Sequence, residues 1–159
     1  MIASMHVTVI AIGSRGDVQP YVALGEGLAR AGYAVRVATH EPFAALLEGR
    51  GLEFYQVGED PAELFANERI HSMLSAGTDA LKFMREFREL LRPVTRRLVA
   101  DCMAACEGTQ AVILSNVGII PGFHQIADTL DAPYCTALLQ PVLPTREFPS
   151  PFTPRLPRW

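Results

Sequence analysis

The sequence predicts an α/β domain with a Rossmann-like parallel sheet and helices on both faces. Short runs of β-branched and apolar residues, typical of strands buried on both faces, alternate with segments of helical spacing. Glycines and prolines fall between these segments, where turns and helix starts need them. Because strands and helices alternate, the crossovers should be right-handed and the strands parallel.

The first half of the chain supplies the clearest elements. Gly13 ends the first apolar run, and Pro20 suits the first turn of the helix that follows. Between them lies a polar loop, Ser14–Asp17. The second strand ends at Thr39-His40. The expected elements are a strand at 7–12, a helix at 20–31, a strand at 35–38, a helix from Pro42 through Leu47 and a strand at 52–57.

The second half is expected to continue the same alternation. Residues 58–78 are less clear, with short helices at 61–66 and 70–74 as one interpretation. Pro93 should kink or divide the long helix that follows, because proline lacks the N–H that a helix interior needs. The remaining expected elements are that long helix at 79–106, a strand at 111–114, a helix at 121–130 and a strand at 134–139.

Composition narrows the class of protein. The 159 residues are 49% hydrophobic and 19% charged, which is ordinary for a globular domain. A formal charge of −3 gives no electrostatic case for nucleic-acid binding. The start of the chain lacks the basic segment and cleavage site of a secretory signal. The three cysteines show neither a disulfide framework nor a zinc spacing, so we expect a reduced, cytoplasmic setting and no metal site.

Proline placement suggests a boundary near residue 140. Six of the 12 prolines lie between Pro141 and Pro157. We therefore expect a compact core at residues 1–140 and an extended, proline-rich loop at residues 141–159. That loop stops without a further element, which we interpret as a truncation and not as a natural end.

The loop after the first strand does not match a dinucleotide fingerprint. Its glycines, Gly13 and Gly16, are three apart, whereas that fingerprint is G-x-G-x-x-G. The second strand ends in Thr39-His40, with no acidic residue for a ribose. Binding of NAD or FAD is therefore not expected. Asp17 instead draws interest, because ligands of open α/β sheets bind outside the carboxyl ends of the strands.

Several motifs together resemble one known family. They are GSRGDVQPYVALGEGLARAGYAVRVATH at 13–40, Pro42-Phe43, GLEF at 51–54, Asp60-Pro61, G-x-H-x-I-A-D at 122–128 and PTREFP at 144–149. In this order they resemble the amino-terminal domain of GT-B nucleotide-sugar glycosyltransferases, of the family-28 amino-terminal type. The sterol-glucosyltransferase-like and antibiotic (macrolide, glycopeptide) branch is the most similar.

This resemblance implies the amino-terminal half of a GT-B fold, the half that binds the acceptor. A second Rossmann-like domain, absent from this sequence, would hold most of a UDP- or dTDP-sugar as co-substrate. Sugar would move with inversion onto the hydroxyl of a hydrophobic acceptor, such as a sterol, macrolide, polyketide or glycopeptide. No essential metal or other cofactor is implied. The fragment alone should be inactive.

The resemblance also assigns residues on the first loop. Asp17 matches the family's general base, and Ser14, Arg15 and Gly16 would shape the donor side of the loop. General-base catalysis is worth about 10²–10⁴ in rate, because an alcohol is a poor nucleophile until its proton is removed. The alternative for Asp17 is a helix cap, although a helix beginning at Pro20 would place the cap at Gln19. The alternative for Arg15 is a surface ion pair.

Acceptor contacts are expected from later segments. Asn116 lies on the loop after the fourth strand, and His124 lies in the helix that follows. Gln140, Phe148 and Phe152 lie in the proline-rich loop, where apolar rings could line a pocket. For His124, and equally for His40, a structural role is the competing interpretation. For the two phenylalanines it is packing against the rest of a larger enzyme.

Two further patterns have a plain and a functional interpretation. Arginines at 85, 88, 92 and 96 could touch anionic lipid heads as a peripheral membrane contact, or form a solvated face with the interleaved glutamates. Cys102 and Cys106, four apart on one helix face, are expected to fill the core. At the level of function, the rival to an enzyme is a non-catalytic small-molecule-binding module, or an acceptor subunit that needs a separate donor-binding subunit.

Overall fold

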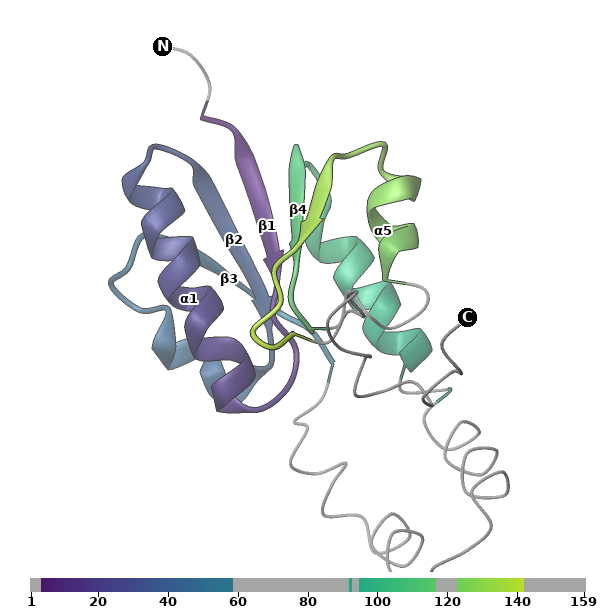
Figure 1. Ribbon diagram of the computed structural model, residues 1–159, viewed down its shortest axis with the longest axis horizontal. Helices are drawn as coiled ribbons and strands as arrows, with labels where there is room; N and C mark the ends of the chain where they lie inside the picture. Colours follow the sequence, from purple (N-terminus) through teal and green to yellow (C-terminus); the bar gives the residue numbers. More distant parts are fainter. Residues whose placement is uncertain (1–3, 59–91, 93–94, 117–122, 142–159) are drawn as a thin grey trace, which may run out of the picture.

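The computed structural model describes residues 4–58, 92, 95–116 and 123–141 (Figure 1). In this part of the chain, five parallel strands form one sheet in the order β3-β2-β1-β4-β5. The strands are β1 (His6–Ile10), β2 (Ala34–Thr39), β3 (Leu52–Gln56), β4 (Ala111–Leu114) and β5 (Tyr134–Thr136). The helices are α1 (Arg15–Arg30), η1 (Glu41–Leu46, of the 3₁₀ type), α5 (His124–Thr129) and helical residues 95–105.

The predicted Rossmann-like α/β fold with a parallel sheet is confirmed. The chain adds β2 and β3 on one side of β1, then returns to place β4 on its other side. A reversal of this kind leaves a crevice between the two central strands at their carboxyl ends, which is where such folds bind ligands. Here the crevice falls between β1 and β4.

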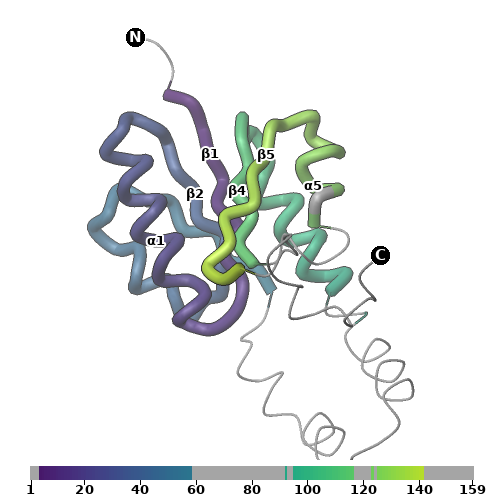
Figure 2. Tube along the Cα trace, viewed as in Figure 1, coloured from purple at the N-terminus to yellow at the C-terminus, as the bar shows by residue number. Residues whose placement is uncertain are grey.

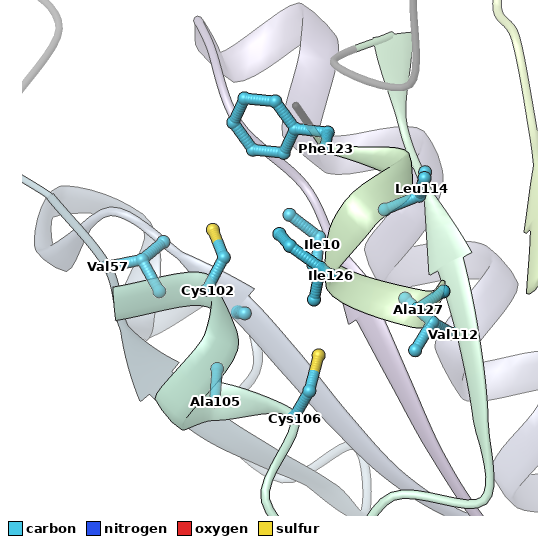
Figure 3. Packing of buried hydrophobic residues seen from close by; sticks show 11 residues of the cluster. Ile10, Val57, Cys102, Ala105, Cys106, Val112, Leu114, Phe123, Ile126 and Ala127 are labelled. Atoms are coloured by element: carbon cyan, nitrogen blue, oxygen red, sulfur yellow. The ribbon is translucent and has the colours of Figure 1, made fainter. Parts of the chain in front are cut away.

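Apolar side chains on both faces of the sheet give the fold two cores. Residues of β1 alternate between them: Val9 packs against α1, and Ile10 packs against helical residues 95–105 and α5. Figure 3 shows the second core, where Cys102 and Cys106 face Ile10 and Ile126. Both thiols are buried, as the core-filling interpretation expected.

Gly25 lets α1 lie close to the sheet. A Cβ atom at this position would come within 3.2 Å of Cδ2 of Leu52 and 3.4 Å of Cγ1 of Val35. The contact with Leu52 is tighter than ordinary van der Waals packing, so a larger residue would require that side chain or the helix to shift.

Arg36 on β2 links the sheet to the end of the helix formed by residues 95–105. Its side chain, 16% exposed, donates from Nη1 to the carbonyl oxygens of Ala105 (2.6 Å) and Glu107 (3.1 Å). A cation at the end of a helix satisfies carbonyls that have no partner within the helix and complements the helix dipole. Arg36 also pairs with Glu53 (2.9 Å) and lies over the ring of Tyr55.

The start of α1 corrects the sequence interpretation. The helix was expected from Pro20, with Gln19 as its cap, but it begins at Arg15 and is capped by Ser14. Ser14 has the extended backbone of an N-cap, with φ −74° and ψ 173°. Residues 15–17, expected in a polar loop, are therefore the first turn of the helix, and Pro20 lies inside it.

Other elements differ from expectation in smaller ways. The segment after Pro42 is a 3₁₀ helix and not an α-helix. Strand β5 ends at Thr136, three residues before the expected end, and α5 is described from His124. The expected helices at 61–66 and 70–74, and most of the one at 79–106, lie outside the described residues, as does the loop at 142–159. Within the described residues, no helix is long and apolar enough to cross a membrane.

Candidate active site

The candidate site lies where β1, β4 and β5 end. The residues after β1 turn into the first turn of α1, and the residues after β4 and β5 run beside that turn (Figure 2). The strand order reverses between β1 and β4 at this point, and open α/β sheets bind their ligands outside the carboxyl ends of the strands at such a reversal. The sequence placed Asp17 and Asn116 at the ends of two separate strands, and the fold brings them together.

Asp17 closes the amino end of α1. Its Oδ2 atom accepts the backbone N–H of Ser14 (3.0 Å) and the Ser14 hydroxyl (2.8 Å). An acidic residue at the third helical position that binds the N–H of the cap residue is one half of a capping box. The capping role that competed with catalysis at the sequence level is thus present, although with Ser14 and not Gln19 as the cap residue.

Gly13 makes room for this carboxylate. Its φ of +131° lies in the region that side chains disfavour. A Cβ atom here would lie 2.7 Å from Oδ2 and 2.9 Å from Cβ of Asp17. The glycine is therefore required twice, once by the backbone turn and once by the side chain that packs over it.

Asn116 joins Asp17 to the end of β5. Its Nδ2 atom donates to Oδ1 of Asp17 at 3.3 Å, and its Oδ1 atom accepts the backbone N–H of Leu139 at 3.3 Å. Both Asp17 and Asn116 are half-buried, whereas Leu139 is 40% exposed. One side chain thus connects the segments that follow three strands.

Tyr21 also links α1 to the segment that follows β5. Its ring is buried one turn after Asp17, and its hydroxyl donates to the carbonyl of Ala137, just past β5. Burial raises the pKa of Tyr21; the backbone of Asn116 opposes the shift, and the negative charge of Asp17 adds to it. The phenol therefore stays protonated at neutral pH and keeps α1 tied to β5.

The remaining residues of the first turn face solvent. Ser14, Arg15 and Gly16 are exposed, and Nε of Arg15 donates to Oε1 of Gln19 (3.3 Å). Arg15 thus forms a local contact along α1, and no ion pair between it and a carboxylate is found among the described residues.

His40 fits its structural interpretation. It is buried at the end of β2, where Nε2 accepts the N–H of Gly13 at 3.4 Å and the ring meets Phe43 edge-on. It thereby binds the backbone of Gly13, just before the first turn of α1 that carries Asp17. Within the described part of the chain, no group of acidic, histidine or cysteine side chains could hold a metal ion.

The other predicted acceptor residues are placed only in part. Gln140 is exposed on the segment after β5. His124 is the first residue of α5. Phe148 and Phe152 lie outside the described residues. Their assignment to the acceptor therefore stays a prediction.

Sequence reasoning missed two features of the site. The pattern Ser14-x-x-Asp17 is a capping-box signature that could have placed the helix start correctly, but Pro20 was given more weight. The second feature is Tyr21, whose ring is buried in the core between α1 and the sheet. No local signal pointed to its hydroxyl bond with Ala137, 116 residues away.

Comparison with known proteins identifies the family. Residues 7–149 match the model of the glycosyltransferase family 28 N-terminal domain. The chain belongs to this family. The resemblance inferred from the motifs is therefore confirmed over nearly the whole sequence.

Family members with curated names include two yeast proteins. The chain is 37% identical over 150 residues to the sterol 3-beta-glucosyltransferase of Yarrowia lipolytica and 36% identical over 149 residues to that of Candida albicans. Each match covers 94% of this chain but only 10% and 9% of the relative. This family 28 domain thus spans about a tenth of the length of these curated relatives.

Two of the solved structures that share this fold are glycosyltransferases. The calicheamicin glycosyltransferase CalG4 superimposes with a TM-score of 0.64 at 16% identity, over 86% of this chain and 33% of that one. The Streptomyces glycosyltransferase SsfS6, crystallised with thymidine diphosphate, gives 0.58 at 22% identity, over 84% and 38%. These likenesses show the fold alone, and the superimposed part makes up about a third of each of these two enzymes.

Proposed function

We propose that this family 28 domain is the acceptor-binding part of an inverting glycosyltransferase. The enzyme would move a sugar from a UDP- or dTDP-sugar to the hydroxyl of a hydrophobic acceptor. The observation that carries the proposal is the position of Asp17. It is half-buried in the first turn of α1, beside the carboxyl ends of β1 and β4, which is where folds of this class bind their ligands.

A sterol is the acceptor that the comparisons favour. The curated relatives at 36–37% identity are named as sterol 3-beta-glucosyltransferases, and their similarity runs through the segments that surround Asp17 and Asn116. Leu139 offers an exposed apolar side chain beside Asn116, which suits a hydrophobic alcohol. Macrolides, polyketides and glycopeptides remain the acceptors to test against it.

Asp17 would act as general base. The carboxylate accepts the proton of the acceptor hydroxyl while the hydroxyl oxygen forms a bond to the anomeric carbon of the sugar. The bond between that carbon and the diphosphate breaks on the opposite side, and the nucleoside diphosphate leaves with the electron pair. Attack opposite to the leaving group inverts the configuration, and no metal is needed for the proton transfer.

The first turn of α1 would face the donor. Ser14, Arg15 and Gly16 are exposed there, at the end of the helix whose dipole favours negative charge. A diphosphate held mainly by a second domain could approach this turn closely. Arg15 adds a cation, because its contact with Gln19 leaves the guanidinium charge uncompensated by any described carboxylate.

The test is a transfer assay with the complete polypeptide that the gene encodes, using a panel of nucleotide sugars and hydrophobic alcohols. Asp17→Asn should lower kcat by about 10²–10⁴ and change KM little, because the variant loses the base but keeps an oxygen for the Ser14 N–H. Asp128→Asn, which removes an exposed carboxylate on α5, is the matched control and should retain activity. Full turnover by Asp17→Asn would show that another group is the base.

The same assay separates the enzyme from a binding module. A module would bind a sterol, measured by calorimetry, yet show no transfer with any nucleotide sugar on the panel. The enzyme should release nucleoside diphosphate and glycosylated acceptor in equal amounts.

A further inference from the structure

The two oxygens of Asp17 have different surroundings. Oδ2 already accepts two hydrogen bonds, from the N–H and the hydroxyl of Ser14, at 3.0 and 2.8 Å. Oδ1 receives a single, longer bond from Asn116, at 3.3 Å. A carboxylate oxygen can accept about two hydrogen bonds, so Oδ1 is the atom with room for an incoming hydroxyl.

Asn116 is itself held at both ends. Its amide nitrogen points to Asp17, and its amide oxygen accepts the N–H of Leu139. Reversing the amide would place an NH₂ group against the N–H of Leu139 and an oxygen against a carboxylate, so both bonds would be lost. The bond from Leu139 therefore fixes which way the amide faces, and the amide fixes where Oδ1 of Asp17 lies.

We propose that Asn116 is a positioning residue that aims Oδ1 of Asp17 at the acceptor hydroxyl. This inference rests on the proposed function, and it replaces the assignment of Asn116 as an acceptor-binding residue. The side chain of Asn116 acts through Asp17, and its anchor on Leu139 links the orientation of the base to the segment after β5. A change of that segment is thereby transmitted to the reacting oxygen.

Few other charged or titratable groups lie near Asp17 among the described residues. The Tyr21 phenol lies one turn along α1 and is held by Ala137. Arg15 lies two residues before Asp17 in the same turn and contacts Gln19. His40 stands behind Gly13 with its Nε2 atom as a hydrogen-bond acceptor. None of these donates a hydrogen bond to Oδ1, so Asn116 dominates the immediate surroundings of that atom.

Asn116→Asp provides the decisive variant. It keeps the size of the side chain and the acceptor for Leu139, but it sets a second carboxylate beside Oδ1. Two carboxylates this close repel each other, so the pair retains one proton to a higher pH. The second proton of the pair should be lost about one to three pH units higher than from an isolated carboxyl group. We expect this shift in the ¹³C titration of the Asp17 carboxyl, measured by NMR on the 159-residue chain, and in the acidic limb of kcat/KM for the complete polypeptide.

Gln110→Glu is the matched control. It makes the same change from amide to carboxylate just before β4, at the opposite end of that strand from Asn116, and it keeps the acceptor for the His6 N–H. The added charge is separated from Asp17 by the length of the strand, so screening should keep the titration of Asp17 within a few tenths of a unit.

Asn116→Ala tests positioning through the rate. Without the amide, the Asp17 carboxylate loses the hydrogen bond that orients Oδ1. Because a misplaced reacting group slows the chemical step, kcat should fall about 10- to 100-fold with KM little changed. Asn116→Asp should show a smaller loss of kcat than Asn116→Ala at pH values above the shifted acidic limb of its pH profile, where Asp17 is ionised. Circular dichroism of each variant establishes that it is folded.

The outcomes separate this proposal from the proposed function. If Asp17→Asn abolishes transfer but both Asn116 variants keep the wild-type rate and titration, Asn116 does not position the base. If Asp17→Asn has no effect on transfer, the base assignment fails, whatever the NMR titration shows. A shifted titration together with a lowered kcat supports the proposal.

Discussion

Gly13→Ala should destabilise the domain more than its small size suggests. The added methyl group meets two obstacles at once: a backbone φ of +131°, and the Asp17 carboxylate at 2.7 Å. The backbone conformation costs about 1–3 kcal/mol for a residue with a side chain. Displacing Asp17 breaks its bonds to Ser14 and removes a helix cap worth about 0.5–2 kcal/mol. We therefore expect a loss of about 2–4 kcal/mol in the free energy of unfolding.

Thermal and urea denaturation measure this loss directly. For a chain of this size, each kcal/mol lowers Tm by about 2–4 °C, so Gly13→Ala should melt about 5–15 °C below wild type. Gly27→Ala is the matched control, because Gly27 lies inside α1 and a Cβ there would meet nothing closer than the Arg30 guanidinium at 3.9 Å. That variant should be more stable by about 0.5–1 kcal/mol, since glycine is a poor helix former.

A double variant shows whether Asp17 is the obstacle. In Gly13→Ala combined with Asp17→Ala, the carboxylate is already gone, so the added methyl group has no side chain to displace. The double variant should therefore lose about 1 kcal/mol or more less stability than the sum of the losses of the two single variants. Two results would refute the reasoning. One is a Gly13→Ala protein with the Tm of wild type, and the other is a double variant whose loss of stability equals the sum of the two single losses.

Three further predictions concern packing and titration. Arg36→Met should lower the free energy of unfolding, measured by urea denaturation, by about 1–3 kcal/mol, because two helix-end carbonyls lose a charged donor. The control Arg50→Met breaks only an exposed ion pair with Glu26 and should lower it by less than about 1 kcal/mol. Burial raises the pKa of Cys106 to about 11 from a usual 9.0, so the folded chain holds this proton more tightly and stability should fall between pH 9 and 11. That fall should shrink in Cys106→Ala, and an identical pH slope in both proteins would contradict the assignment. A thiol reagent at pH 8 should modify exposed Cys135 quickly and reach buried Cys102 and Cys106 only on unfolding; rapid reaction of all three would contradict their burial.

The strands could be predicted because their signal is local. Val7, Val9 and Ile10 form an apolar run that only a doubly covered strand accommodates, and the structure buries all three. The start of α1 was mispredicted because two local signals disagreed. Pro20 pointed to a late start, and Ser14-x-x-Asp17 to an early one. The early signal prevailed because the cap supplies hydrogen bonds, whereas the proline forfeits a single backbone bond near the beginning of the helix.

The site was predictable residue by residue but not as an arrangement. Asp17 and Asn116 each follow a strand, and this could be inferred from the sequence. Their contact, across 99 residues, exists only because β4 returns to lie beside β1 and not outside β3. Nothing in the sequence around Asn116 indicates which strand will be its neighbour. The strand order alone decides that its amide meets a carboxylate.

The two roles of Asp17, cap and proposed base, support each other. A free carboxylate at a crevice would sample several rotamers, and only one would meet the acceptor. Because Ser14 binds Oδ2, the side chain is ordered by an interaction that stabilises α1 in any case, and the other oxygen is left for chemistry. Fixing a reacting group before the substrate arrives lowers the entropic part of the barrier. The helix cap therefore contributes to catalysis in this proposal, and Gly13 contributes to both by leaving the space that the carboxylate fills.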